Sequence, residues 1–230
     1  MASSPPPSSG PEPDAPSSGI EAIPLPPADL DQRQLPLTTL AERQLSLYRC
    51  HRTDAAYSPV SFNFRRIDNH FNAPAGEYGV LYLGTDPACS FIESFGSSMV
   101  TAALELRLVS ETDLRRRCLC EIELAVDPAT IRLVNLADGY GVSRLGIDGR
   151  ISTTKQRAVT RQWAFALWNH PQQPDGLLYR ACNDLERLSI VLFDRVGDIL
   201  RPTCDRKNFL RDPHELAQML DYYEIGLDPD

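Results

Sequence analysis

Three residues of this chain combine chemical capacity with positions that suit the edge of a cleft. Arg49 lies in an alternating segment and shares a face with apolar residues, so its guanidinium points toward the interior or a cleft, where it could bind a phosphate or a carboxylate. Tyr82 stands in the middle of the apolar segment 79–83, and in a pocket its ring would stack on a planar ligand. Glu93 lies at the margin of the apolar stripe of a predicted helix. A carboxylate there would stabilise a developing positive charge.

Each of the three residues also has a structural interpretation, and taken singly each pattern favours it. Arg49 could pair with a structural acid or extend along the surface to water. Tyr82 could fill the core with its hydroxyl bonded, and Glu93 could be the solvated flank of a helix. Both sets of interpretations remain open at this point.

The elements that must position these residues alternate irregularly between strands and helices. Asp86-Pro87 is typical of a helix start, with an N-cap residue followed by proline in the first turn. Helices are expected from Thr38 or Thr39 through Gln44, over 87–96, from a cap at Ser152–Thr154 through Trp168, and over 213–223. Strands are expected over 46–51, 79–83, 118–126, 131–134, 176–180 and 189–194, with a turn at 196–198. This pattern predicts an α+β fold with one domain over residues 37–230.

The first 36 residues differ in composition from the rest of the chain. Ten of the 19 prolines lie there, interspersed with serines and without any aromatic residue. Such a segment buries too little apolar surface to offset the entropy of ordering. We therefore expect residues 1–36 to form a disordered Pro/Ser-rich tail.

Composition and missing motifs exclude several classes of protein. The net charge of -8 disfavours a nucleic-acid binder, and neither a membrane-spanning apolar run nor a secretory signal is recognisable, so a cytoplasmic protein is expected. The glycine-rich signatures of Rossmann dehydrogenases, P-loop NTPases and α/β-hydrolases are missing from the sequence. The six cysteines and four histidines fit no zinc spacing. We expect reduced, mostly buried thiols and no metal site.

Read together and in order, several segments resemble the RES-domain family. They are Leu47–His51, Gly79–Gly84 leading into Asp86–Glu93, Arg161–Trp163, Asp175–Arg180 and Ser189–Asp194. The resemblance implies an ADP-ribosyltransferase-like fold that binds NAD without a Rossmann motif. It also implies a toxin of a toxin–antitoxin module, partnered by an Xre-type antitoxin, that consumes NAD by phosphorolysis or hydrolysis or transfers ADP-ribose to a protein. A homo-oligomer is compatible with the sequence.

The resemblance assigns roles to five residues. Arg49 would bind the pyrophosphate or an incoming phosphate, Tyr82 would stack on nicotinamide, and Glu93 would stabilise the cation formed at the ribose. His70 and Arg180 are secondary candidates for phosphate contacts. NAD would be a substrate and inorganic phosphate a co-substrate, with no resident cofactor.

Two positions depart from the pattern of the family. His70 stands where an arginine is often found, and Ala181 stands where the signature serine is expected. Three functions therefore remain open: an NAD-degrading enzyme, a protein ADP-ribosyltransferase, and a non-catalytic binding module that keeps the fold.

Overall fold

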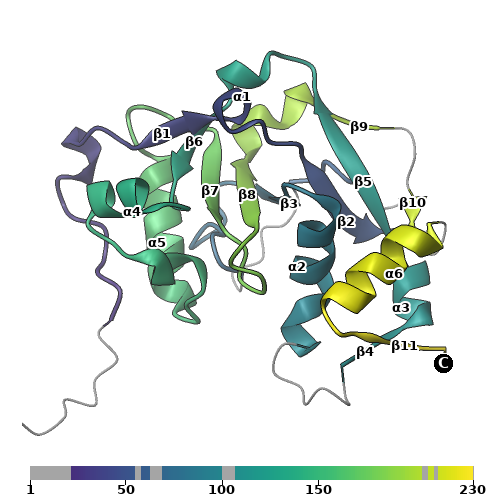
Figure 1. Ribbon diagram of the computed structural model, residues 1–230. Helices are drawn as coiled ribbons and strands as arrows, with labels where there is room; N and C mark the ends of the chain where they lie inside the picture. The colour runs from purple at the N-terminus through teal and green to yellow at the C-terminus, as the bar shows by residue number, and fades with distance from the viewer. Residues whose placement is uncertain are drawn as a thin grey trace, which may run out of the picture.

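A long mixed sheet forms the centre of the computed structural model, which describes residues 22–54, 58–62, 69–99, 107–203, 207–209 and 212–229 (Figure 1). The strand order is β1 (Leu37–Thr39), β6 (Arg132–Asn135), β7 (Gly176–Arg180), β8 (Leu188–Phe193), β3 (Val80–Gly84), β2 (Tyr48–Arg52), β5 (Arg117–Leu124) and β10 (Lys207–Asn208). A further strand, β9 (Leu200–Pro202), pairs with β5. Neighbours are antiparallel except β6 and β7.

Helices gather at both ends of this sheet. Near β6 and β7 lie α1 (Leu40–Arg43), α4 (Gly139–Leu145) and α5 (Arg157–Trp168), and near β2 and β5 lie α2 (Pro87–Met99), α3 (Glu111–Arg115) and α6 (Pro213–Tyr222) (Figure 1). A small parallel pair joins β4 (Leu108–Ser110) to β11 (Gly226–Asp228). The expected α+β class is confirmed, and no helix in the described ranges is long and apolar enough to cross a membrane.

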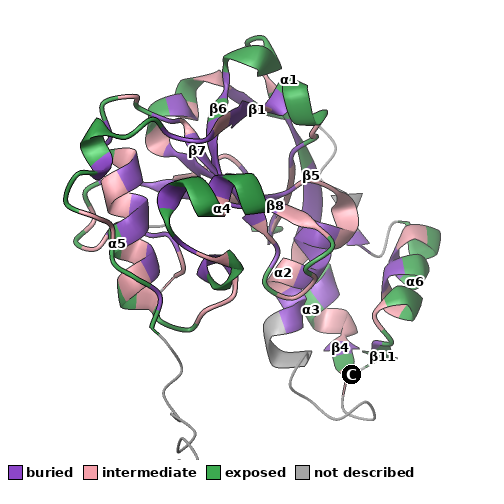
Figure 2. Cartoon of the chain, turned by 60° about the vertical axis from the view of Figure 1, so that its left-hand side comes forward, coloured by how far each residue is buried: buried purple, intermediate pink, exposed green. Residues whose placement is uncertain are grey.

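The central strands are buried on both faces, which explains why they read as continuous apolar runs. On one face Val191 and Leu177 pack with Trp163 of α5. On the other face Leu81 and Leu192 belong to a second cluster. A third cluster, in which α2, α3 and α6 meet, covers the β2–β5 end of the sheet. Figure 2 shows the sheet strands mainly buried, whereas α4 and α6 carry exposed residues.

The sheet splits between β2 and β3. β3 pairs with β8 at five positions from Val80 to Gly84, and β2 pairs with β5 at five positions. The only register pair between β2 and β3, within the described residues, joins Tyr48 to Gly84. Beyond that pair the two strands diverge, and backbone groups of β3 that face β2 must find other partners.

Helix α2 begins at this split, as the Asp86-Pro87 signal predicts. The Asp86 carboxylate accepts a hydrogen bond from Cys89 N at 2.8 Å, and Ser90 Oγ donates to Tyr48 O at 2.9 Å. A Cβ at Gly84 would lie 2.6 Å from Ser90 N. The glycine therefore permits the close approach of α2 to β3.

The expected start of one helix differs from the structure. Helix α5 starts at Arg157 and not directly after Ser152–Thr154, because Gly149–Ser152 forms a separate 3₁₀ turn and Thr154 Oγ1 accepts from Gln156 N. Asp212, in contrast, caps α6 as expected through Glu215 N.

The predicted tail is wrong for residues 22–36, which pack on the domain. Ile23, Leu30 and Leu35 are buried. Trp163 Nε1 donates to Pro24 O at 2.7 Å, and the buried His170 ring bonds Leu30 O at 3.1 Å. The few apolar residues between the prolines therefore reach into the core under α5. Residues 1–21 lie outside the described residues.

Candidate functional site

Arg49 lies in the split of the sheet. Its Nη1 donates to the carbonyl oxygen of Tyr82 at 2.6 Å, a group of β3 that has lost its ladder partner on β2. The two residues that the sequence placed 33 positions apart are thus in direct contact.

The positive charge and the hydrogen-bond donors of the Arg49 guanidinium are only partly satisfied by partners among the described residues. Its Nε is buried without a hydrogen-bond partner, and the ion pairs formed among the described residues do not include it. Burial lowers the pKa of Arg49 to about 10, because desolvation penalises the charged form. A buried cation in this state favours the approach of an anion.

Tyr82 is fixed by its hydroxyl. The hydroxyl donates to Asn72 Oδ1 at 2.8 Å and accepts from Phe71 N at 2.8 Å. Burial raises the pKa of Tyr82, so the phenol stays neutral. The hydroxyl is thus occupied by the loop that precedes β3, and the ring remains half-buried.

Glu93 is held from the loop that follows β7. Its Oε1 accepts from Asn183 N at 2.9 Å, and Cys182 N also donates to this carboxylate. Burial raises the pKa of Glu93, and these hydrogen bonds oppose the rise. The alternative interpretation of Glu93 as a solvated helix flank does not hold: Glu93 is half-buried with its carboxylate bonded to backbone.

Tyr179 connects the surroundings of Tyr82 and Glu93. This buried phenol on β7 has a pKa raised by burial first and then by the charge of the Glu93 carboxylate, and it belongs to the same apolar cluster as Tyr82. Its hydroxyl bonds the side chain of Ser189, which lies 3.4 Å from Cys89 Sγ. Arg49 thus contacts Tyr82, and Tyr82 and Glu93 share a neighbour. That all three line one crevice for a dinucleotide stays a prediction.

His70 lies beside this group with both ring nitrogens occupied. Nε2 is 2.5 Å from Ile151 O, and since a carbonyl oxygen only accepts, Nε2 carries the proton. Arg157 Nη1 contacts Nδ1, which must then accept. The ring stacks on Tyr179 with centroids 6.4 Å apart. His70 therefore fixes Arg157 in place, and a phosphate contact from its own nitrogens would require one of these bonds to break.

Arg180 is committed to backbone carbonyls. Its Nε donates to Ala137 O at 2.9 Å, and its Nη1 donates to Leu185 O and Glu186 O. The structure does not bring its guanidinium into contact with Arg49, Tyr82 or Glu93. The buried Ala181 follows it, where a serine was expected.

Several residues of this site escaped the sequence patterns. Asn72 and Tyr179 are buried polar residues in apolar surroundings, and Asn183 lies in a loop whose conformation only the fold determines. Arg157 lies in a predicted helix, but the sequence does not specify its contact with His70. The Asn-His-Phe-Asn segment at 69–72, between the strands expected at 46–51 and 79–83, was the one available signal, because an asparagine outside helices and strands often bonds a neighbouring backbone group.

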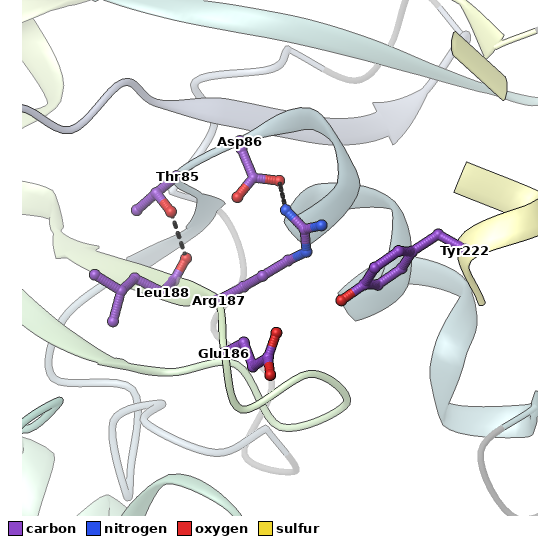
Figure 3. Close-up of a pocket in the computed structure, with 6 residues that line it drawn as sticks. All are labelled: Thr85, Asp86, Glu186, Arg187, Leu188 and Tyr222. Atoms are coloured by element: carbon purple, nitrogen blue, oxygen red, sulfur yellow. Dashed lines mark hydrogen bonds and ion pairs between the residues drawn. The ribbon is translucent and has the colours of Figure 1, made fainter. Parts of the chain in front are cut away.

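Two surface hollows lie elsewhere. One of about 350 Å³ is lined by Thr85, Asp86, Glu186, Arg187, Leu188 and Tyr222 (Figure 3). The second, of about 410 Å³, is lined by Gly139, Tyr140, Ser143 and Arg144. Neither is lined by Arg49, Tyr82 or Glu93. Within the described part of the chain no cluster of His, Cys, Asp or Glu side chains could hold a metal ion.

One of the comparisons with known proteins identifies the family. One chain of the crystal structure of the M. tuberculosis MbcT–MbcA toxin–antitoxin complex is similar at 16% identity with a TM-score of 0.49, over 74% of this chain and 87% of that chain. No curated protein matches the sequence. The model of the RES domain matches residues 46–210, which include every candidate site residue. The chain therefore belongs to the RES-domain family.

Proposed function

We propose that the protein cleaves the nicotinamide–ribose bond of NAD, with inorganic phosphate or water as the acceptor. The observation that carries this proposal is the position of the Arg49 guanidinium in the split of the sheet. Its Nε has no hydrogen-bond partner, and no carboxylate among the described residues forms an ion pair with it. Membership of the RES family supports a toxic, NAD-acting enzyme.

The chemistry requires few groups. The bond between the ribose C1′ and the nicotinamide nitrogen breaks, and its electron pair leaves with nicotinamide, which becomes neutral. Since the leaving group is cationic beforehand, no general acid is needed. An oxygen of phosphate or water then bonds C1′, and the acceptor loses a proton to solvent. A cation develops at the ribose on the way, as in other glycosyl transfers.

The residues of the site suit these steps. Arg49 would bind the pyrophosphate or the incoming phosphate, for which its planar fork is well matched. Glu93 would stabilise the ribose cation, and the backbone N–H of Asn183 holds its carboxylate in one orientation. Tyr82 would present its ring to nicotinamide, because its hydroxyl is already bound.

The test is the release of nicotinamide from NAD by the purified full chain, with and without inorganic phosphate. We expect release from the wild-type protein. ADP-ribose-1″-phosphate as the product identifies phosphorolysis, and ADP-ribose identifies hydrolysis. A mass increase on a supplied protein extract, with little turnover otherwise, identifies transfer to a protein acceptor.

Matched variants separate the site from the fold. Glu93→Gln and Arg49→Lys should abolish release, whereas Glu123→Gln on β5 and Arg144→Lys on α4, both exposed residues, should leave it unchanged. NAD binding in calorimetry without any turnover would support the non-catalytic alternative. If the folded wild-type protein neither binds NAD nor cleaves it, the proposal is refuted. An Xre-type antitoxin partner stays a prediction.

A further inference from the structure

A closed set of contacts runs from helix α2 through the 182–187 loop and back to Glu93. Arg187 Nη1 bonds Asp86 Oδ1 at 2.7 Å, the same oxygen that caps the first turn of α2. Arg187 Nε bonds Asp184 Oδ2 at 2.9 Å. Asn183, the next residue back along the chain, donates to Glu93 on the second turn of α2. Glu93 is thus held between two segments that Arg187 ties together.

The C-terminal helix supplies a further support. Tyr223, directly after α6, donates its hydroxyl proton to Asp184 Oδ2 at 2.8 Å, and the same oxygen accepts from Arg187 Nε, which also lies 2.9 Å from the Tyr223 hydroxyl. The Arg187 guanidinium lies over the ring of Tyr222, 5.4 Å from its centroid. Figure 3 shows Arg187 extending from the end of the loop before β8 toward Asp86, with Tyr222 facing it.

These contacts are well sheltered and chemically strong. The side chain of Asp184 is only 9% exposed and that of Arg187 26%. Hydrogen bonds between charged groups are shorter and stronger than neutral ones, and their strength rises as water is excluded. The contacts of Arg187 and Tyr223 therefore hold the loop that carries Asn183 in place.

We propose that Arg187 and Tyr223 are positioning residues for Glu93, so that the C-terminal helix takes part in the proposed reaction although it lies beyond the RES match at residues 46–210. This inference rests on the proposed function. Neither residue needs to touch NAD: both fix the backbone N–H groups that orient the Glu93 carboxylate.

Two substitutions test this, one that removes a hydroxyl group and one that replaces a guanidinium group by an ammonium group. Tyr223→Phe removes the hydroxyl and keeps the ring, which lies against Phe91 with centroids 6.5 Å apart. Arg187→Lys keeps the charge and loses the forked contact to Asp86 and Asp184. Tyr222→Phe is the matched control, since it keeps the ring over which Arg187 lies and no described hydrogen bond depends on its hydroxyl.

The expected kinetic result is a fall in kcat with little change in KM for NAD. Loss of orientation at a reacting group costs roughly tenfold to hundredfold in rate, and Tyr222→Phe should match the wild type. The acidic limb of the pH profile should move to higher pH in Tyr223→Phe and Arg187→Lys, because the N–H groups that lower the pKa of Glu93 are then held less often. The titratable groups that act on or beside Glu93 are Asp184, Cys182, Tyr179 and Cys89.

A second readout does not depend on turnover. Amide hydrogen exchange at Asn183 should be faster in Tyr223→Phe and Arg187→Lys than in the wild type and Tyr222→Phe. If the wild-type protein is inactive and exchange is still faster in the two variants, the coupling is upheld and only the proposed function is refuted. Unchanged kcat, pH limb and exchange in a folded variant would overturn the inference, and if one of the two variants does not fold, the other decides.

Discussion

Replacing Arg49 with methionine distinguishes a substrate-binding cation from a structural one. In the folded chain, burial lowers the pKa of Arg49 to about 10, a shift that corresponds to a cost of about 3 kcal/mol for keeping the group charged. Because the pKa is lower in the folded state, this cost is fully present below about pH 10 and disappears only as the pH rises above it. At neutral pH, methionine therefore relieves it.

The substitution also removes a hydrogen bond. The carbonyl of Tyr82 loses the donor that lies 2.6 Å away, and a buried acceptor without a partner costs about 1–3 kcal/mol. The two contributions nearly cancel. We expect the free energy of unfolding to rise by between zero and about 2 kcal/mol in Arg49→Met.

Urea unfolding at pH 7 in phosphate-free buffer measures this difference, with Arg144→Met as the exposed control. A second series adds NAD. A ligand at about 100 times its Kd stabilises the native state by about 2.7 kcal/mol, so the wild type and Arg144→Met should gain stability, and Arg49→Met should not.

A loss of about 3–5 kcal/mol in Arg49→Met would refute this reasoning. Such a loss is typical when one member of a compensated buried ion pair is removed. It would show that Arg49 has a structural anion as its partner, and its role toward NAD would then be excluded.

Three further outcomes are expected. Tyr82→Phe should unfold at a temperature several degrees lower, since the buried Phe71 N–H and Asn72 side chain lose their shared partner at about 1–3 kcal/mol; equal melting temperatures would contradict the bonded hydroxyl. Glu93→Gln should lose nicotinamide release without becoming less stable at pH 8, because burial raises the pKa of Glu93 and the ionised form is disfavoured in the fold. A melting temperature below that of the wild type would argue against this. The rate of the wild-type protein should fall as the pH decreases through the raised pKa of Glu93. Leu30→Ala should cost about 2–5 kcal/mol in denaturant unfolding, because the side chain is 4% exposed, and a change near zero would show that the N-terminal segment does not pack on the domain.

The order of elements could be predicted because local signals and burial agreed. The apolar run at 79–83 became β3, and the Asp86-Pro87 signal marked the start of α2. The contact between Arg49 and Tyr82 could not be predicted in its detail, because it depends on where β2 separates from β3. Pairing register is a property of two strands, and neither sequence specifies it alone.

Composition misled at the N-terminus for a physical reason. A proline-rich segment cannot form its own core, but it can bury single apolar side chains in a core built by others. Ile23 and Leu30 do this. The ring N–H groups of Trp163 and His170, about 140 residues away, donate to the backbone carbonyl oxygens of Pro24 and Leu30. For Glu93 the helical position was correct, and the loop that holds it was unforeseen because Asn183 lies 90 residues further along the chain.

Because only the Tyr48–Gly84 pair joins β2 to β3 in register among the described residues, the sheet should open most easily between these two strands. On either side of this line, β2 pairs with β5 and β3 pairs with β8 at five positions each. The two halves of the sheet therefore resist distortion internally. Separating the two halves would break this one register pair, the Arg49 bond to Tyr82 and the bond from Ser90 Oγ to Tyr48 O, and would part Leu47 from Leu81 in the second apolar cluster. Local opening should therefore be most frequent along this line, and such an opening would leave the strand pairing within each half of the sheet intact.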